Sequence, residues 1–465
     1  MESDFNQQIW ATQPTIEERM AAGKALREKF PREMHGEYKP AENRVDPVSI
    51  LEEQAKTRLP FLVPIRYARM LTSPFAFLRG SAAVMAADLA TGTKTTGINV
   101  QACGDMHVSN FGVFGSAERN LVFGINDFDE TLPGPWEWDL KRLTTSAVTA
   151  CRFLGGSEKL CRESVLAAVE SYRKHMKRYA NMGYLQLYYE TIKGNDILDV
   201  ISPSARKGAE KLFEKARKRT HIQVLAKLTD IVDKKNLLKV NSPFIVRETH
   251  SQSGRPIEEA LRLVLESYFN SLSNEKKQLL SHYTIVDVVR KVVGVGSVGT
   301  RCWVIFLKGN HSEDPLFLQV KEAQTSVLEP FAGKSAYSNH GQRVVTGQRL
   351  LQAAPDIFIG WGELDGIHFY IRQLRDMKGG VEFDPQKAKI KNIPQYTSLC
   401  GWALALAHAK SGDAAMIAGY AGKSNELDKA IARFAFSYAE QTEKDFNALD
   451  EAAKSGRISV AEKSE

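Results

Sequence analysis

The chain has 465 residues, of which 43% are hydrophobic and 25% are charged. This composition is typical of a folded globular protein and excludes a disordered or fibrous chain. The formal net charge of +7 comes from 62 Lys and Arg against 55 Asp and Glu residues. So mild an excess of positive charge does not by itself predict binding to nucleic acid. The sequence contains no run of about 18 apolar residues, so no membrane span is predicted.

The five cysteines are scattered along the sequence without a C-x-x-C pair, at positions 103, 151, 161, 302 and 400. This spacing argues against a zinc site or a disulfide framework and is typical of reduced thiols. The first five residues are polar and acidic, unlike a signal peptide. We therefore expect a cytoplasmic protein with no membrane partner and no specific nucleic-acid partner. The sequence leaves the oligomeric state open.

The first part of the chain is predicted to combine helices with a few short strands. Apolar residues recur at helical spacing over residues 16–29, 59–90 and 138–180, and Ser73-Pro74 interrupts the second of these segments. Short hydrophobic runs predict strands at residues 97–102, 111–114 and 120–125. Residues 205–240 are rich in Lys and Arg; they fit either a solvated helix face or a surface that binds anions or polymers.

The pattern changes near residue 285. Alternating β-rich segments, separated by glycine and polar turns, predict an antiparallel meander at residues 286–289, 302–307 and 316–320. A helix is predicted next, and then two more strands, at residues 342–353, 357–361 and 369–373. Helical spacing returns at residues 398–410 and 427–448. The predicted fold class is therefore α+β.

Two polar clusters follow the first predicted strands. Asp105 and Asn110 lie in one cluster, and Asp127 and Asp129 lie in the other, at the end of a second hydrophobic run. Carboxylate and amide oxygens on neighbouring loops suit Mg²⁺, which binds one or two carboxylates together with substrate phosphates. Asp and Asn are also common in turns and helix caps. A structural role is therefore the alternative for each residue taken alone.

A G-x-G-x-x-G pattern lies within residues 292–300. In a dinucleotide-binding fold a helix follows such glycines, whereas here the strand-like segment 301–307 follows. A glycine-rich turn between two strands covers the ATP phosphates in protein kinases, and an ordinary hairpin is the alternative. The next predicted strand carries Lys321, which is suited to neutralise phosphate charge or is a surface lysine. The candidate phosphate-binding residues are Gly294, Gly296, Ser297, Gly299 and Lys321.

Residues 103–110 resemble the catalytic loop of aminoglycoside and choline phosphotransferases, whose pattern is H-G-D-L-H-x-x-N. The triplet Asp127-Phe128-Asp129 resembles their metal-binding D-F-G or D-x-D motif. Asp139 resembles the downstream Asp that braces the catalytic loop from the next helix, which implies a structural role for it. Cys103 departs from the pattern, because the family has His at this position.

The glycine turn and Lys321 resemble the small lobe of a kinase, and residues 372–376 fall where its hinge would hold adenine. In a kinase the glycine turn precedes the catalytic loop, whereas here it follows. Residues 402–413 resemble the helix that leads into the catalytic loop. The resemblance implies a circularly permuted, bilobal protein-kinase-like fold, with a small antiparallel-sheet lobe inserted between parts of a helical large lobe. Permutation is tolerable where the original termini lie close together.

This resemblance implies four parts: an N-terminal helical extension, a first part of the large lobe with the catalytic and metal-binding loops, a small lobe, and C-terminal helices of the large lobe. Their ranges are 1–60, 61–284, 285–376 and 377–465. The chain from about residue 50 to residue 448 also resembles the bacterial family "domain of unknown function 2252". The segments that carry this second resemblance are 73–80, 126–142, 342–345 and 407–413.

The resemblance implies a phosphotransferase that uses ATP and Mg²⁺ and acts on a hydroxyl acceptor, more readily a small molecule than a protein. Asp105 would orient the hydroxyl and take its proton, with His107 and Arg79 as further candidate catalytic residues. The candidate metal ligands are Asn110, Asp127 and Asp129. The candidate ATP-binding residues are those of the glycine turn with Lys321, together with Gln373 and Leu374 at the hinge.

One further departure concerns the partner of Lys321. A helix of the kinase small lobe supplies a Glu for this lysine, and the predicted helix 342–353 contains none. Glu329, Gln342 or Gln348 would substitute, or the pair is absent. Two other functions therefore stay open: a nucleotidyl transferase that moves AMP from a reversed ATP, and a catalytically weak regulator that binds nucleotide.

Overall fold

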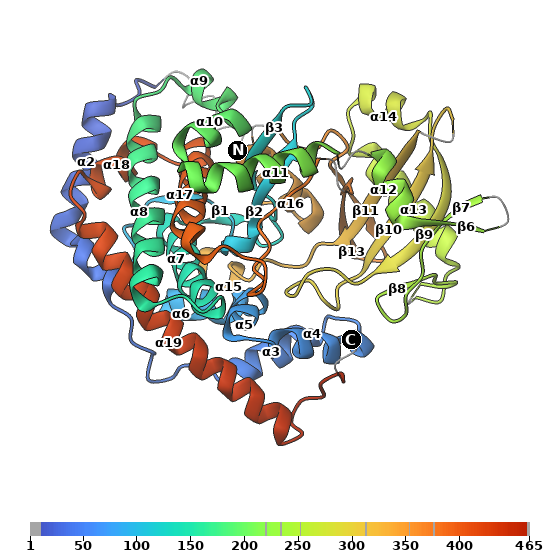
Figure 1. The fold of residues 1–465 in the computed structure, drawn as a ribbon, viewed down its shortest axis with the longest axis horizontal. Coiled ribbons are helices and arrows are strands. Elements are labelled where there is room, and N and C mark those ends of the chain that lie inside the picture. Colours follow the sequence, from blue (N-terminus) through green and yellow to red (C-terminus); the bar gives the residue numbers. More distant parts are fainter. Residues whose placement is uncertain are drawn as a thin grey trace.

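The computed structural model describes residues 11–462, except residues 219–220, 233–234, 252, 312–313, 353 and 375–376. The described residues form an α+β fold in which helices fill one part of the molecule and a six-stranded antiparallel sheet forms the other (Figure 1). None of the described helices is both long enough and apolar enough to cross a membrane.

The helical part is built around α7 (Trp136–Phe153), whose side chains are buried from Trp136 to Cys151. Five helices pack around it and along one edge of the molecule, where α2 lies against α18 (Figure 1). These helices are α2 (Ile16–Lys29), α8 (Glu158–Ala180), α17 (Ile393–Ser411), α18 (Ala414–Ala421) and α19 (Glu426–Lys454). Further helices complete this part: α3 (Pro47–Ala55), α4 (Val63–Met70), α5 (Pro74–Gly80), α6 (Ala82–Gly92), α9 (Tyr184–Tyr189), α10 (Gly194–Val200) and α11 (Pro203–Lys218).

Polar caps explain where several of these helices begin. The Thr15 hydroxyl accepts a hydrogen bond from the Glu18 amide at 3.1 Å, and Glu18 accepts one from the Thr15 amide at 2.7 Å. Ser73 caps α5 by accepting from the amide of Ala76 at 3.1 Å. Such caps satisfy amides that have no partner inside the helix. They account for the helix predicted over residues 16–29 and for the interruption predicted at Ser73-Pro74.

Two small sheets position the polar loops. Strand β1 (Asn99–Ala102) pairs with β4 (Leu132–Pro135), and β2 (Phe111–Gly115) pairs with β3 (Leu121–Ile125); β3 also pairs with β5 (Ile192–Lys193). One loop runs from β1 to β2 and the other runs back from β3 to β4. Both loops therefore join the same two sheets and lie side by side, with the Asn126 amide donating to the Asn110 carbonyl at 2.8 Å.

The strand order of the larger sheet is β12-β13-β11-β10-β9-β8, and its paired strands are antiparallel. Its strands are β8 (Ile245–Val246), β9 (Thr284–Lys291), β10 (Cys302–Lys308), β11 (Pro315–Glu322), β12 (Gly360–Leu364) and β13 (Ile367–Gln373). The remaining described helices and strands are α12 (His221–Leu228), β6 (Thr229–Val232), β7 (Lys235–Leu238), α13 (Ile257–Asn270), α14 (Asn274–Leu280), α15 (Glu329–Ala332) and α16 (His340–Leu351).

Side chains alternate across this sheet, as the period-two pattern of a strand requires. Leu318 and Val320 of β11 pack in one apolar cluster with Tyr268 of α13. Phe317 packs in a second cluster with Leu238 of β7. Lys321, an even number of residues from Phe317, therefore faces away from α13.

The structure refines several sequence predictions. The predicted helix 138–180 is two helices, because the chain turns at Gly155, whose φ of 80° favours glycine. The predicted strand 357–361 is displaced to β12, since the Asp356 side chain accepts from the Phe358 amide at 2.9 Å and forms a turn there. Ala353, at the end of the predicted helix 342–353, lies outside the described residues. The basic residues of α11 are exposed, which agrees with a solvated helix face; Arg219 lies outside the described residues.

Helices α8 and α17 approach closely at Gly401, where an added Cβ would lie 2.1 Å from the Ala168 carbonyl oxygen. We expect Gly401→Ala to lower the free energy of unfolding by about 1–3 kcal/mol, because the helices must move apart. Urea unfolding measures this effect. The control is Gly208→Ala on α11, where an added Cβ meets no atom within 4 Å; it should leave stability unchanged or raise it by up to about 1 kcal/mol. Wild-type stability of Gly401→Ala would contradict the close approach.

His35 is 3% exposed, and its Nε2 lies 2.7 Å from the Tyr420 hydroxyl. Burial, assisted by the charge of Lys141, lowers its pKa from 6.5 to about 3. The unfolded chain therefore binds a proton that the folded chain resists, and stability is lost as the pH falls below 6.5. We expect His35→Gln to reduce the loss of unfolding free energy between pH 7 and pH 5 by about 2 kcal/mol. Equal losses in both proteins, measured by urea unfolding, would refute this assignment.

Candidate functional site

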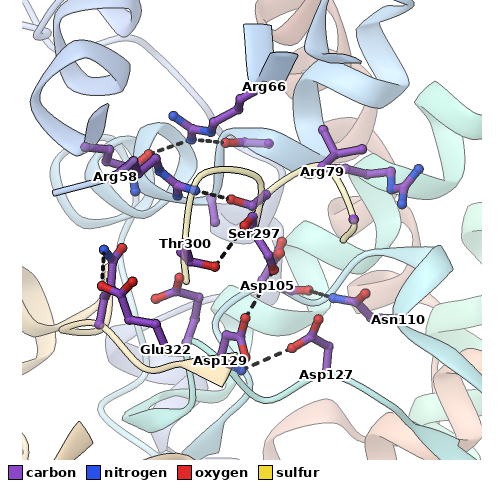
Figure 2. A pocket seen from close by; sticks show the side chains of 18 of the residues that line it. Arg58, Arg66, Arg79, Asp105, Asn110, Asp127, Asp129, Ser297, Thr300 and Glu322 are labelled. Carbon is purple, nitrogen blue, oxygen red and sulfur yellow. Dashed lines mark hydrogen bonds between the residues drawn. The ribbon is translucent and has the colours of Figure 1, made fainter. Parts of the chain in front are cut away.

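Three segments of the chain line one polar pocket, and the third is far from the other two in the sequence (Figure 2). They are residues 54–82 before the first loop, residues 105–130 in the two polar loops, and residues 294–324 in the larger-sheet part. The pocket brings together most of the predicted site residues: Arg79, Asp105, His107, Asn110, Asp127, Asp129, Gly294, Gly296 and Ser297. Gly299 and Lys321 lie just behind it, as their contacts below show.

Helix α7 holds the loop after β1 in place through Asp139. The Asp139 carboxylate accepts hydrogen bonds from the amides of Cys103, at 2.6 Å, and Gly104, at 2.9 Å. His408 of α17 lies 3.2 Å from the same carboxylate. Gly104 has a φ of 77°, and an added Cβ would lie 2.7 Å from the Glu130 carbonyl oxygen. Asp139 therefore occupies the bracing position that the sequence predicted, and the two polar loops touch at Gly104.

Asp105 projects into the pocket with one oxygen engaged. Its Oδ1 accepts from Nε and Nη2 of Arg142, at 2.8 and 2.5 Å. Its Oδ2 lies 3.8 Å from Nε2 of His107, beyond hydrogen-bond distance. Burial raises the pKa of Asp105, and the charge of Arg142 opposes this rise. Burial lowers the pKa of His107 well below its usual value, and the charges of Arg79 and Arg142 add to this effect.

Asp129 joins the polar loop to the larger sheet. It forms an ion pair with Lys321 of β11 and accepts a hydrogen bond from the Tyr370 hydroxyl at 2.7 Å. The Ser297 hydroxyl of the glycine turn also donates to it, at 3.4 Å (Figure 2). Burial is the largest influence on Lys321 and opposes its charge, but Asp129, Tyr370 and Asp127 together outweigh it, and the pKa of Lys321 is raised well above its usual value. Burial raises the pKa of Asp127, and the negative charge of Asp129 raises it further.

The partner of Lys321 is Asp129 and not a residue of α16. Glu329 lies 3.7 Å from His340 instead, and Gln348 donates to Gln352 at 2.9 Å. Helix α16 contributes Arg343, which is 2% exposed. Its guanidinium donates to the backbone carbonyls of Thr131, Asp129 and Gln324 at 2.7–2.8 Å. A buried arginine on α16 therefore holds the backbone around Asp129 in place.

The glycine turn is fastened to the segment that precedes α5. Arg58 donates to the carbonyls of Gly296 and Val298, at 2.8 and 2.5 Å, and Arg69 donates to the carbonyl of Gly294 at 2.6 Å. The Leu59 amide donates to the carbonyl of Gly299 at 2.8 Å. Gly294 and Gly299 have φ values of 68° and 95°. The backbone geometry therefore favours glycine at both positions.

The two predicted hinge residues do not line this pocket. Gln373 lines a second pocket with Asn126 and Arg372. Leu374 packs against the apolar cluster that contains Phe317, because its amide donates to the Phe317 carbonyl at 2.8 Å and extends the pairing of β13 with β11. The rest of the predicted hinge, Arg375 and Asp376, lies outside the described residues. Adenine binding by Gln373 and Leu374 stays a prediction.

Several residues that line the pocket or hold its side chains in place were not predicted as functional from the sequence. Arg142 lies three residues after Asp139, a spacing that places both on one face of α7 and could have indicated a second contact to the loop. Arg58 and Arg66 lie in a segment without a recognisable motif. Tyr370 aligns with Lys321 only through strand register, which the sequence does not define. No group of three or more Cys, His, Asp and Glu side chains forms a metal site among the residues that the structure describes.

We expect Asp139→Asn to lower the free energy of unfolding by about 1–3 kcal/mol, because one of two buried amides then faces an NH₂ group. Urea unfolding measures this change. Asp199→Asn on α10, where the carboxylate is exposed, is the control and should change stability by less than about 0.5 kcal/mol. If the two variants proved equally stable, the bracing role of Asp139 would be wrong.

Comparison with known proteins gives one match. The model of a family described as "Uncharacterized protein conserved in bacteria (DUF2252)" matches residues 58–452. No curated protein and no solved structure matches the chain. The matched segment contains Asp105, Asp127, the glycine turn and Lys321, so the residues that converge on the pocket belong to the part that defines the family. The chain is therefore a member of the DUF2252 family of uncharacterized bacterial proteins.

Proposed function

We propose that this protein is a phosphotransferase that uses ATP and Mg²⁺ and transfers a phosphoryl group to a hydroxyl of a small molecule. The observation that carries the proposal is the convergence of two distant segments on one pocket. Asp105 and Asp127 come from the polar loops, whereas Ser297 comes from the glycine turn. Lys321 reaches the same place through its ion pair with Asp129.

The strand connectivity supports a permuted, bilobal kinase-like fold. Strands β9, β10 and β11 are adjacent and antiparallel, with the glycine turn between the first two and Lys321 on the third. Protein kinases also use a glycine-rich loop to cover phosphates and a lysine on the third strand. The order of the two parts along the chain is inverted, as a circular permutation requires. Because α2 packs against α18 and α3 packs against α19, helices from early and late in the described chain lie in the same helical part.

The pocket has the groups that phosphoryl transfer requires, which are mostly positioning groups and charges. Lys321 is a buried cation on the phosphate side. The amides of Gly296 and Ser297 have no backbone partner within the described part of the chain, so they are available to phosphate oxygens. On the acceptor side, Oδ2 of Asp105 is available to accept the proton of a hydroxyl, while Arg142 fixes Oδ1.

The residues present fit a magnesium ion that is shared with substrate phosphates. The Asn110 amide nitrogen donates to the Asp105 carbonyl at 2.8 Å, which turns its oxygen toward other partners. Asp127 has no cationic side chain within 4 Å among the described residues. Mg²⁺ commonly takes one or two protein carboxylates and completes its shell with phosphates and water. Asn110, Asp127 and Asp129 would hold the ion, which supplies positive charge to the transferred phosphate when bound.

Ligand-induced thermal stabilisation tests the proposal. Mg-ATP at 100 times its dissociation constant should stabilise the wild-type protein by about 2.7 kcal/mol. We expect Lys321→Met and Asp127→Asn to lose this stabilisation, because each removes a contact to phosphate or metal. Asp105→Asn should keep it, because this side chain contacts the acceptor. ATP with EDTA in place of Mg²⁺ is the control.

The test compares the stabilisation by Mg-ATP between the wild type and the three variants. Equal stabilisation of all four proteins, or no response in the wild type, would show that the site assignment is wrong. Mass spectrometry of an incubated acceptor identifies the transferred group, because a phosphoryl and an adenylyl group differ in mass. An adenylyl group would overturn phosphoryl transfer in favour of nucleotidyl transfer.

A further inference from the structure

Three arginines line the side of the pocket opposite Asp127 and Asp129 (Figure 2). Arg58 precedes α4, Arg66 lies within α4, and Arg79 lies at the end of α5. Arg66 is fully buried and Arg58 is 8% exposed. The pocket therefore has a carboxylate side and a guanidinium side, and the proposed nucleotide chemistry accounts only for the first.

The three guanidinium groups are incompletely paired. Within the described part of the chain, none of them forms an ion pair with a carboxylate, and Nε of each has no hydrogen-bond partner. Nη1 of Arg66 is also buried without a partner, although its Nη2 donates to Gln54 and to the Gly80 carbonyl at 3.0 and 2.9 Å. Buried donors without partners are rare in folded proteins, and each requires an explanation.

Two other arginines in this protein, Arg173 and Arg44, show one way in which such a charge is compensated. Arg173 binds both oxygens of Asp428, at 2.9 and 2.7 Å. Arg44 binds Asp88 and Asp445 in the same bidentate way. Burial lowers the pKa of Arg58, Arg66 and Arg79, as expected for cations that lack a counterion. Burying a charge without a partner is strongly unfavourable. A bound anion would offset this unfavourable free energy, which the contacts within the protein leave uncompensated.

The guanidinium group favours one class of ligand. Its planar set of donors matches the oxygens of a phosphate or a carboxylate. The arginines are part of the site and do not form a separate surface patch, because Arg58 also donates to the carbonyls of Gly296 and Val298 in the glycine turn. Arg79 lines the pocket together with Asp105, the proposed proton acceptor. A group bound by the arginines is therefore adjacent to the acceptor side of the site.

We propose, on the basis of the phosphotransferase function above, that Arg58, Arg66 and Arg79 bind an oxyanion group of the acceptor. The acceptor is then a small molecule that carries a phosphate or carboxylate in addition to its reacting hydroxyl. The other source of the same chemistry is the nucleotide itself, whose phosphates would occupy the arginines instead. Binding of a second anion while the nucleotide is present separates these two sources.

Isothermal titration with inorganic phosphate, with and without saturating Mg²⁺ and a non-hydrolysable ATP analogue, tests the inference. We expect phosphate to bind the wild-type protein under both conditions. Arg66→Gln and Arg79→Gln should each weaken binding by about ten- to a hundredfold, because each removes charge-assisted hydrogen bonds. Arg206→Gln makes the same change in net charge on α11, where Arg206 pairs with Glu210, and should leave phosphate affinity unchanged.

Three results would overturn the inference: no phosphate binding by the wild type, wild-type affinity in both pocket variants, or expulsion of phosphate by the nucleotide analogue. Arg79 is only partly buried, so Arg79→Gln decides the matter if Arg66→Gln fails to fold. Titration of the wild-type protein with the Mg-nucleotide analogue alone separates this inference from the phosphotransferase function. A protein that binds phosphate but no Mg-nucleotide would contradict the phosphotransferase function and retain the anion site, whereas the reverse would contradict the anion site alone.

Discussion

The site depends on the ion pair between Asp129 and Lys321. This contact joins a loop of the helical part to a strand of the larger sheet, and the hydroxyls of Tyr370 and Ser297 bond the same carboxylate. A buried ion pair offsets the cost of dehydrating its charges only when its geometry and extra hydrogen bonds are good. Asp129 meets that condition, since its oxygens are shared among a strand lysine, a strand tyrosine and the glycine turn.

Helix α7 supports the other half of the site. It presents Asp139 to the backbone of the loop and Arg142 to the side chain of Asp105, so that one helix sets both the path of the loop and the orientation of the carboxylate. Helix α16 has a similar function for the second loop, through the contacts of Arg343 with three carbonyl groups. Buried polar side chains on rigid helices thus position residues that are on loops.

The sequence was most informative about features that depend on residues close together in the chain. The spacing of Asp105, Asn110 and Asp127 and the glycine pattern identified the loops that meet in the pocket, and helical periodicity located α2 and most long helices. It could not define contacts that depend on register or on packing between distant elements. The pairing of Lys321 with Asp129 is of this kind, because it requires the two parts of the fold to be in place. The alignment of Tyr370 beside Lys321 depends instead on the register of β13 with β11. The sequence also did not define the position of Gln373 and Leu374 outside this pocket, which follows from the pairing of β13 with β11.

The two polar loops are bridges between the same pair of small sheets, and this linkage has a mechanical consequence. If the larger sheet moved relative to the helices, the loops bearing Asp105 and Asp127 would stay together, because both are anchored in the same two small sheets. Lys321 lies on the larger sheet, whereas the glycine turn is also held by Arg58 and Arg69 of the helical part. Such a movement would separate Lys321 from Asp129 and weaken phosphate binding. Asp105 and Asp127, which would contact the hydroxyl and the metal, would keep their relative positions.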